Sequence, residues 1–247
     1  MRPAVCVLAL LAAACRDDAG AIDGIFYDGD GRRVHCAINL DSAAGNGDDS
    51  VDHALDRAAA RGEVVELYAH RPGRTVPLEK LEHVLAGAVD RGLRPVTYAD
   101  FAAGEGLGPG LALSFDDAAV DEWTSARPLF QQYGARVTFF VTRYPGFTDE
   151  DRAELRQLAA DGHDIQAHGI AHRRAPAYVE AHGITAYLED EALPSIDVLR
   201  ADGYEVSAFA YPYGARTAEL DRALGRYVPV LRSVVFSFEG AFSPCPR

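Results

Sequence analysis

Two short segments of this chain carry side chains that together could hold a metal ion and activate water. The segment His168–His172 places two imidazoles four residues apart, a spacing that points both toward one site on a helical turn or tight loop. The apolar run that begins at Leu111 ends in two adjacent aspartates, Asp116 and Asp117. Two imidazoles and one carboxylate form a common ligand set for a catalytic divalent metal, because three protein ligands leave a position open for water. The second aspartate is then free to act on that water.

Each of these signals has a structural explanation when it is taken alone. A strand that ends in two aspartates most often leads into a solvated loop, and two histidines in this spacing more often lie on a surface or in a core. A third motif adds weight to the combination. The segment Phe209–Gly214 has the pattern of a strand that runs into a turn at Pro212 and Tyr213.

In this order the three motifs resemble those of the polysaccharide deacetylases of the NodB-homology type, also called carbohydrate esterase family 4. The pattern of that family is Thr-Phe-Asp-Asp, then His-x-x-x-His, then Arg-x-Pro-Tyr. The counterparts here are Ser114–Asp117, His168–His172 and Ala210–Tyr213. The segments Arg136–Val141 and Asp161–Ile165 are similar to the second strand of the family and to the usual lead-in to the histidine pair. The resemblance extends from about residue 21 to the C-terminus.

The resemblance implies a divalent metal held by Asp117, His168 and His172. It implies zinc first, with Co²⁺, Ni²⁺ and Fe²⁺ as alternatives. It also implies that Asp116 acts as the general base toward the attacking water.

The remaining roles follow from the same resemblance. The backbone N–H of Tyr213, in the turn that begins at Pro212, is implied as the donor that stabilises the oxyanion. An amine leaves poorly unless it is protonated, so the reaction also needs a general acid, and His70 fits this role. Asp41 is the candidate for tuning His70, although a carboxylate that caps a strand end explains it almost as well.

Three positions depart from the family pattern. The arginine that orients the base in the family falls at Ala210, so another group must steady Asp116. The glycine that usually follows the two aspartates is Ala118. No tryptophan follows Asp41, so the aromatic wall that the family has there is missing or comes from elsewhere.

The order of the motifs is unusual for this family. In most members, a strand with an acidic residue and then a strand ending in Leu-x-His follow the Pro-Tyr motif. Here two strands of this kind, Cys36–Asp41 and Val64–His70, precede Asp116 instead. The chain therefore resembles a circularly permuted deacetylase, similar to the poly-N-acetylglucosamine deacetylases of biofilm systems. A barrel tolerates such a permutation because its first and last strands are neighbours.

Apolar runs alternate with amphipathic runs along the chain, which implies parallel strands joined by crossover helices. With the resemblance, this alternation predicts an α/β fold, a circularly permuted and distorted (β/α)7 barrel with its site at the carboxyl ends of the strands. The predicted strands are Ile22–Tyr27, Val34–Leu40, Val64–Ala69, Leu93–Tyr98, Leu111–Phe115, Val137–Thr142, Asp164–Ala167, Val206–Tyr211 and Leu231–Phe238. The predicted helices are Val51–Ala60, Pro77–Arg91, Ala119–Tyr133, Asp149–Ala160, Thr185–Ala201 and Ala218–Arg226.

The composition suits one globular domain. The chain has 247 residues, of which 48% are hydrophobic and 25% are charged, enough for a sizeable core. Its net charge of −13 argues against nucleic acid and against an anionic membrane surface as partners. We expect residues 1–20 to be a leader and residues 21–247 to form a single deacetylase domain.

The N-terminus has the features of an export signal. Arg2 gives a minimal positive region, and Val5–Ala14 is an apolar run too short to span a bilayer. The run ends in Leu-Ala-Ala-Ala-Cys, similar to a bacterial lipobox, so we expect Cys15 to carry lipid and to begin a mature lipoprotein that faces the periplasm or the cell surface. Cleavage after small residues without lipidation, which would give a secreted protein, is the alternative.

Export leaves two cysteines to be explained, Cys36 and Cys245, because Cys6 leaves with the leader and Cys15 would be lipidated. In an oxidising compartment these two thiols can pair, and the bond would tie the two ends of the domain together. Two unpaired cysteines are the alternative.

These features predict an exported, metal-dependent hydrolase that removes N-acetyl groups from amino sugars in a polysaccharide or glycoconjugate. One alternative keeps the fold and the metal but hydrolyses another amide or an ester. The other is a catalytically silent glycan-binding module, which the departure at Ala210 favours and the presence of Asp116 and His70 disfavours.

Overall fold

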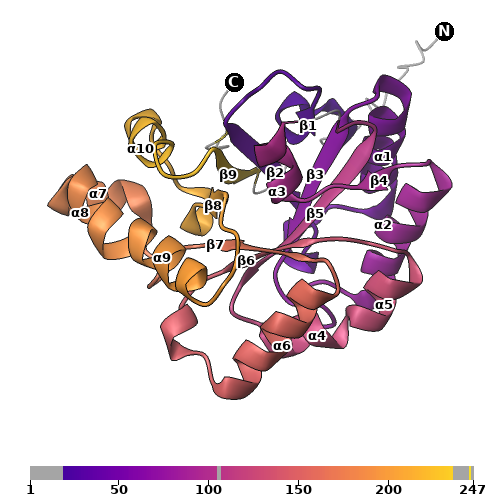
Figure 1. Cartoon of the computed structure of the whole chain (residues 1–247). Coiled ribbons are helices and arrows are strands. Elements are labelled where there is room, and N and C mark those ends of the chain that lie inside the picture. Colours follow the sequence, from indigo (N-terminus) through magenta and orange to yellow (C-terminus); the bar gives the residue numbers. More distant parts are fainter. Residues whose placement is uncertain (1–18, 105–106, 236–244, 246–247) are drawn as a thin grey trace, which may run out of the picture.

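A computed structural model of the chain describes residues 19–104, 107–235 and 245 (Figure 1). Its strands are β1 (Phe26–Tyr27), β2 (Val34–Asn39), β3 (Val64–Ala69), β4 (Arg94–Pro95), β5 (Gly110–Asp117), β6 (Thr138–Val141), β7 (Asp164–Ala167), β8 (Ala208–Ala210) and β9 (Val230–Val235). Its α-helices are α1 (Asp48–Arg61), α2 (Leu78–Asp90), α3 (Tyr98–Ala103), α4 (Val120–Ser125), α5 (Arg127–Gln132), α6 (Asp149–Ala160), α7 (Ala175–His182), α8 (Ile184–Tyr187), α9 (Leu193–Ala201) and α10 (Ala218–Leu224).

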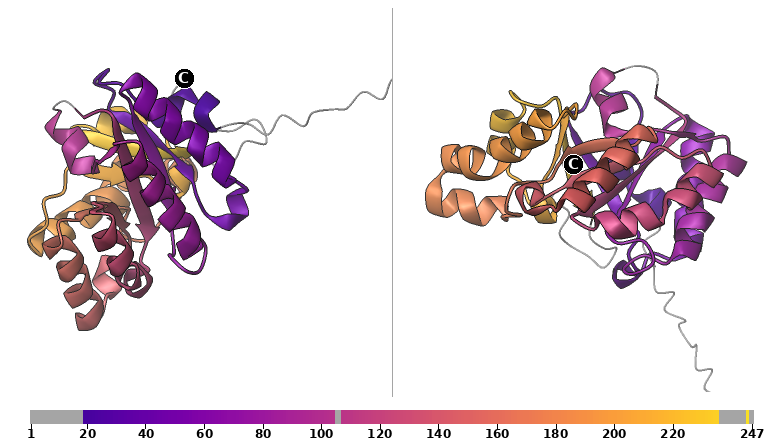
Figure 2. Two further views of the ribbon diagram at one scale, coloured as in Figure 1. Left: turned by 90° about the vertical axis from the view of Figure 1, so that its right-hand side faces the viewer. Right: turned by 60° about the horizontal axis from the view of Figure 1, so that its bottom comes forward.

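Seven parallel strands in the described part of the chain close into a barrel. Hydrogen bonds join them in the order β3-β2-β9-β8-β7-β6-β5, and β5 pairs with β3 to complete the ring. The short β1 adds to β3 in the antiparallel direction, and β4 adds to β5 in the parallel direction. Helices surround the strands, with α1 and α2 on one side and α7 to α9 on the opposite side (Figure 1, Figure 2). The predicted (β/α)7-type barrel is confirmed.

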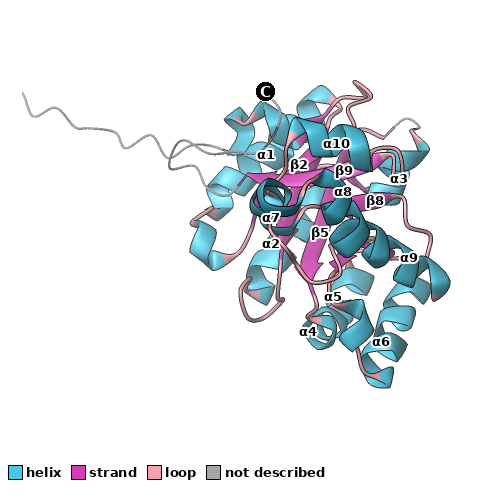
Figure 3. Ribbon diagram, turned by 90° about the vertical axis from the view of Figure 1, so that its left-hand side faces the viewer, coloured by secondary structure: helices cyan, strands magenta, loops and turns pink. Residues whose placement is uncertain are grey.

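The strands are buried on both faces because helices cover the outside of the barrel (Figure 3). In β5, the outward side chains of Leu111, Leu113 and Phe115 belong to the main hydrophobic core. Burial of each such side chain stabilises the fold by about 1.5–3 kcal/mol. The alternate positions, which include Ser114 and Asp116, face the inside of the barrel.

The inside of the barrel combines small apolar residues with a few large side chains. Ala112, Ala208 and Ala210 pack in one buried cluster with Phe140. This interior also accommodates the side chain of Arg232, which is completely buried. The large polar side chain of Arg232 fits inside the barrel because the neighbouring alanines are small.

Parallel strands bring all their carboxyl ends to one rim of the barrel. Asp41 follows β2, His70 follows β3, Asp116 and Asp117 end β5, and His168 follows β7. The topology alone therefore gathers the polar residues of distant segments at one edge.

Two predicted strands are much shorter than expected. Residues Asp23–Ile25 form a 3-10 turn, and only Phe26 and Tyr27 pair with β3. The strand predicted over Leu93–Tyr98 ends at Pro95, because Thr97 begins α3 with a capping box in which its side chain and that of Asp100 each accept a backbone N–H.

Two predicted helices are interrupted where proline removes a backbone donor. The helix predicted over Ala119–Tyr133 is divided into α4 and α5, and Pro128 lies in the first turn of α5. The helix predicted over Thr185–Ala201 contains a π-helical turn, Leu188–Ala192, just before Pro194.

The first and last strands of the barrel are neighbours. β2 pairs with β9 in parallel, from Val34↔Leu231 to Ile38↔Val235. Beside this seam, Cys36 forms a disulfide with Cys245, and their Cα atoms lie 5.9 Å apart. Cys15 lies outside the described residues, so its lipidation stays a prediction. The end of the strand predicted over Leu231–Phe238, after Val235, also lies outside them.

Among the described helices, none has both the length and the apolar character needed to cross a membrane.

Candidate active site

The two carboxylates at the end of β5 point in different directions. Asp116 is the last inward-facing residue of the strand and is 3% exposed. Asp117 has a positive φ of 89°, which turns its side chain toward solvent, and 40% of that side chain is exposed. A non-glycine residue in this conformation carries strain of about 1–3 kcal/mol, which structures retain mostly at functional sites. One aspartate is thus held inside the barrel and the other at its mouth.

His168 follows β7 and is 2% exposed. Its Nδ1 lies 2.9 Å from the carbonyl oxygen of Ala210, so Nδ1 carries the proton and donates it, and the Nε2 lone pair faces the site. Burial is the main cause that lowers the pKa of His168, and nearby Arg232 acts in the same direction. Against the opposite effect of Asp116, the pKa falls to about 4. The ring is therefore neutral at pH 7, the form that binds metals.

His172 completes a cluster with His168 and Asp117. The distance between His172 Nε2 and Asp117 Oδ1 is 3.2 Å, and the distance between His168 Nε2 and Asp117 Oδ1 is 3.7 Å. Burial raises the pKa of Asp117, but the two histidines lower it to a greater extent, so the carboxyl group is ionised.

The chemistry of this donor set fits a divalent cation. One ligand atom from each of Asp117, His168 and His172 lies within 4.8 Å of the others. Two neutral imidazoles and one carboxylate are the donors that zinc and similar metals prefer, and three protein ligands leave room for a further group. The predicted ligand residues therefore lie together in the structure.

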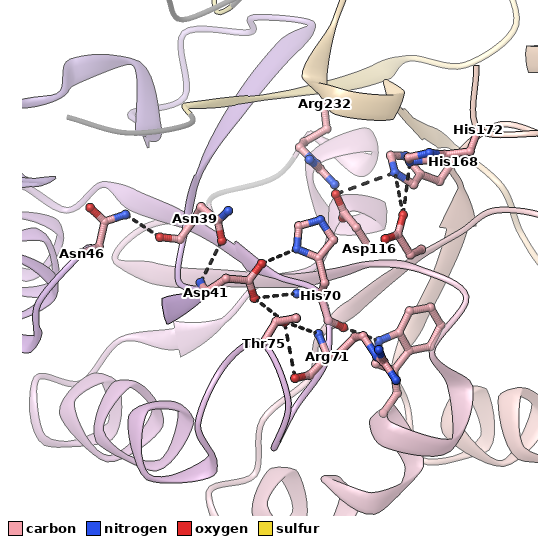
Figure 4. Close-up of polar contacts among 12 residues, drawn as sticks. Asn39, Asp41, Asn46, His70, Arg71, Thr75, Asp116, His168, His172 and Arg232 are labelled. Atoms are coloured by element: carbon pink, nitrogen blue, oxygen red, sulfur yellow. Dashed lines mark hydrogen bonds and ion pairs between the residues drawn. The ribbon is translucent and has the colours of Figure 1, made fainter. Parts of the chain in front are cut away.

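Asp116 forms an ion pair with Arg232 of β9, and both side chains are buried (Figure 4). The Arg232 guanidinium lies between the rings of Tyr68 and Phe140, with its central carbon 5.1 Å and 4.8 Å from their centroids. Arg232 is paired in register with Ala210 on the neighbouring strand. The family pattern places an arginine at position 210. Here the guanidinium that steadies Asp116 comes instead from Arg232, at the paired position of the neighbouring strand.

His70 lies on the same rim, between Asp41 and Asp116 (Figure 4). Its Nδ1 is bonded to Asp41 Oδ2, and its backbone N–H donates to Asp41 Oδ1 at 3.2 Å. The Thr75 hydroxyl also donates to Asp41 Oδ1, at 2.7 Å. Burial lowers the pKa of His70, but the bond to Asp41 and the charges of Asp116, Asp41 and Asp117 raise it to about 8.

Tyr213 lies in a 3-10 turn, Pro212–Gly214, directly after β8. Its backbone has a positive φ of 60°, and its ring is half exposed and lies 4.6 Å from the ring of His172. Gly214 has φ 59°, and a Cβ there would lie 2.4 Å from Val234 Cγ2, so the turn requires glycine. The Tyr213 N–H donates to no group within the described residues.

Arg232 was not identified as a functional residue from the sequence. The available signal was an arginine inside the apolar run Val230–Val235, because a buried charge requires a partner. The partner, Asp116, is 116 positions away in sequence, and only the register of β8 and β9 shows that Arg232 stands beside Ala210.

A family model described as polysaccharide deacetylase matches residues 104–227, half of the chain. The match contains the cluster of Asp117, His168 and His172. His70 and Arg232 lie on either side of it in the sequence.

Three known proteins are similar to this chain in sequence or in structure. A gellan lyase of a Bacillus species is 30% identical over 105 residues, which are 42% of this chain and only 4% of the length of that protein. The structure of IcaB from Ammonifex degensii has a TM-score of 0.56 and 21% identity, and covers 71% of this chain and 86% of its own. The BpsB deacetylase domain from Bordetella bronchiseptica has a TM-score of 0.50 and 17% identity, and covers 86% of this chain and 97% of its own. Both structures share the fold of this chain.

Proposed function

The chain belongs to the polysaccharide deacetylase family, and on this basis we propose that it is a metal-dependent hydrolase that removes N-acetyl groups from amino sugars in a polysaccharide or glycoconjugate. The observation that carries the proposal is the arrangement on one rim of a three-residue ligand cluster, a buried carboxylate and a histidine that bears its own carboxylate partner.

In this proposal, Asp117, His168 and His172 would hold a divalent cation, which when bound polarises a carbonyl and lowers the pKa of water from about 15.7 toward 7. Asp116 accepts the proton of the attacking water. Its ion pair with Arg232 holds the carboxylate in a fixed position, as a general base requires.

The N–H of Tyr213, which has no acceptor in the part of the chain that the structure describes, is suited to stabilise the oxyanion that forms when water attacks the acetamide carbonyl. One donor of this kind is worth about 3 kcal/mol of transition-state stabilisation. His70 then donates a proton to the leaving nitrogen, and Asp41 holds the ring in the tautomer and orientation that this step requires.

The proposal is tested by measuring free amine and acetate released from N-acetylglucosamine oligosaccharides of different linkage, with O-acetylated sugars as a second substrate set. We expect equimolar amine and acetate from N-acetylated glycans, and no release after treatment with a chelator. Acetate from the esters alone would show an esterase. Glycan binding without any release would show a silent binding module.

Replacing Arg232 with methionine is expected to lower kcat by up to about 10²-fold, because Asp116 then loses the buried guanidinium that orients its carboxylate. The change is also expected to destabilise the fold by about 3–5 kcal/mol, as for other buried pairs that lose one partner. The measurements are kcat at a temperature at which the variant is folded, and urea unfolding.

Two variants separate positioning from stability in this test. Arg216→Met breaks another largely buried ion pair, the one with Asp221, and should leave kcat near the wild-type value. Adding Ala210→Arg to Arg232→Met returns a guanidinium to the same level on the neighbouring strand and should restore kcat in part. An unchanged kcat in Arg232→Met would show that Arg232 does not position Asp116.

The pKa of His70 leads to a separate prediction for alkaline pH. A general acid acts in its protonated form, so activity should fall as pH rises through about 8. A bound divalent cation offsets the effects of Asp116 and Asp117 but leaves the bond to Asp41. Asp41→Asn is therefore expected to move the alkaline limb down by about 1–3 pH units. Asp197→Asn, at an exposed position of α9, removes the same charge and should not move it. If the alkaline limb lies at the same pH in Asp41→Asn and Asp197→Asn, the role of Asp41 is contradicted.

A further inference from the structure

The loop that carries the second histidine lies on a buried carboxylate. This loop, residues 169–173, follows His168, and Glu191 beneath it is completely buried. The N–H of Ala171 donates to Glu191 Oε2 at 3.1 Å, and the N–H of Arg173 donates to Glu191 Oε1 at 2.8 Å. The N–H of Ile170 donates to the main-chain oxygen of Glu191 at 3.0 Å. One residue therefore accepts three hydrogen bonds from the loop.

The backbone on both sides is shaped for this contact. Gly169 has φ 80°, and a Cβ there would lie 2.2 Å from Glu191 Oε1 and 3.3 Å from Pro212 Cγ, so only glycine lets the carboxylate approach. Glu191 itself lies in the π-helical turn Leu188–Ala192. Such turns are rare and occur frequently at functional sites.

The loop needs this support because His172 has a strained backbone. Its φ is 63°, a left-handed conformation that a non-glycine residue keeps only when its surroundings hold it there. This conformation directs Nε2 to within 3.2 Å of Asp117 Oδ1. The hydrogen bonds to Glu191 flank His172 on both sides, at Ala171 and Arg173. Without them, the loop could relax and turn the ring away.

We propose that Glu191 is a positioning residue that sets the affinity of the ligand cluster for a divalent cation. This inference rests on the metal site proposed above. Glu191 does not belong to the ligand cluster. Its carboxylate holds the loop of His172, and with it the second imidazole, in the binding geometry before a cation arrives, so less conformational freedom is lost on binding. Supporting groups of this kind typically contribute 10–100-fold to metal affinity.

The test is the affinity of the metal-free protein for Zn²⁺, measured by competition with a chelating dye and without any assay of activity. Glu191→Gln keeps the shape of the side chain but removes its charge and one of its two acceptor oxygens. The expected result is a Kd for Zn²⁺ that is about 10–100-fold weaker than that of the wild type, measured at a temperature at which both proteins are folded.

Tyr187→Leu is the matched control. Tyr187 is buried one turn before Glu191, and its hydroxyl has no hydrogen-bond partner among the described residues. This change is expected to lower the melting temperature by altering the packing beneath the same helices. It removes no bond to the loop, so the Kd should stay at the wild-type value. Equal affinity of wild type and Glu191→Gln would overturn the role of Glu191 alone. Absence of Zn²⁺ binding by the wild type would overturn the proposed metal site and this role together.

Discussion

Replacing Asp116 with asparagine is expected to lower kcat about 10²–10⁴-fold while the protein keeps its metal. An amide cannot accept the proton of the attacking water at neutral pH. The metal should remain because Asp117, His168 and His172 form the ligand cluster, whereas Asp116 is turned inward toward Arg232. The measurements are turnover of an N-acetylated oligosaccharide and metal content of the same preparation.

Asp117→Asn is the matched control, since it makes the same chemical change one residue away. It should lose metal, and activity with it, because Asp117 Oδ1 lies 3.7 Å from His168 Nε2 and 3.2 Å from His172 Nε2. The opposite pattern, with metal lost in Asp116→Asn and retained in Asp117→Asn, would mean that the two carboxylates have been assigned in reverse.

Replacing His168 with alanine is expected to weaken Zn²⁺ binding more than 100-fold, beyond the 10–100-fold effect typical of residues that only support a ligand. The change removes a neutral imidazole whose Nδ1 is anchored at 2.9 Å on Ala210 and whose Nε2 faces the cluster. Turnover should fall with metal occupancy. The measurements are the metal content after dialysis and the Kd for Zn²⁺.

His163→Gln serves as the control for this second result. His163 is also buried near β7, where its Nδ1 accepts the N–H of Val137 at 3.2 Å, and a glutamine oxygen can accept the same bond. It should therefore keep the wild-type affinity for Zn²⁺. Equal metal content in His168→Ala and wild type would exclude His168 as a ligand.

The barrel could be predicted from the sequence because the pattern of its strands is local. Runs such as Val64–Ala69 and Asp164–Ala167 appear with the predicted bounds. The strands predicted to begin at Ile22 and Leu93 are mostly absent, because local turn and capping residues outweigh the tendency of apolar residues to form a strand. The π-helical turn at Leu188–Ala192 has no sequence pattern of its own, so Glu191 remained hidden in a predicted helix.

The residues of the cluster could be proposed because they lie within two short motifs. His70 was harder, since it precedes Asp116 by many residues, and its position next to Asp41 depends on the pairing of β2 with β3. Arg232 could not be located, because its contact depends on strand register rather than on spacing. The neighbouring positions of β2 and β9 are what a circularly permuted barrel requires.

The most direct test of the account is the release of amine and acetate from N-acetylglucosamine oligosaccharides by metal-free protein before and after addition of one equivalent of Zn²⁺, with Asp116→Asn treated in parallel. The account predicts no release before addition, equimolar amine and acetate after it, and a rate for Asp116→Asn that is lower by about 10²–10⁴-fold at equal metal content. Equal rates with and without metal, or wild-type activity in Asp116→Asn, would contradict it.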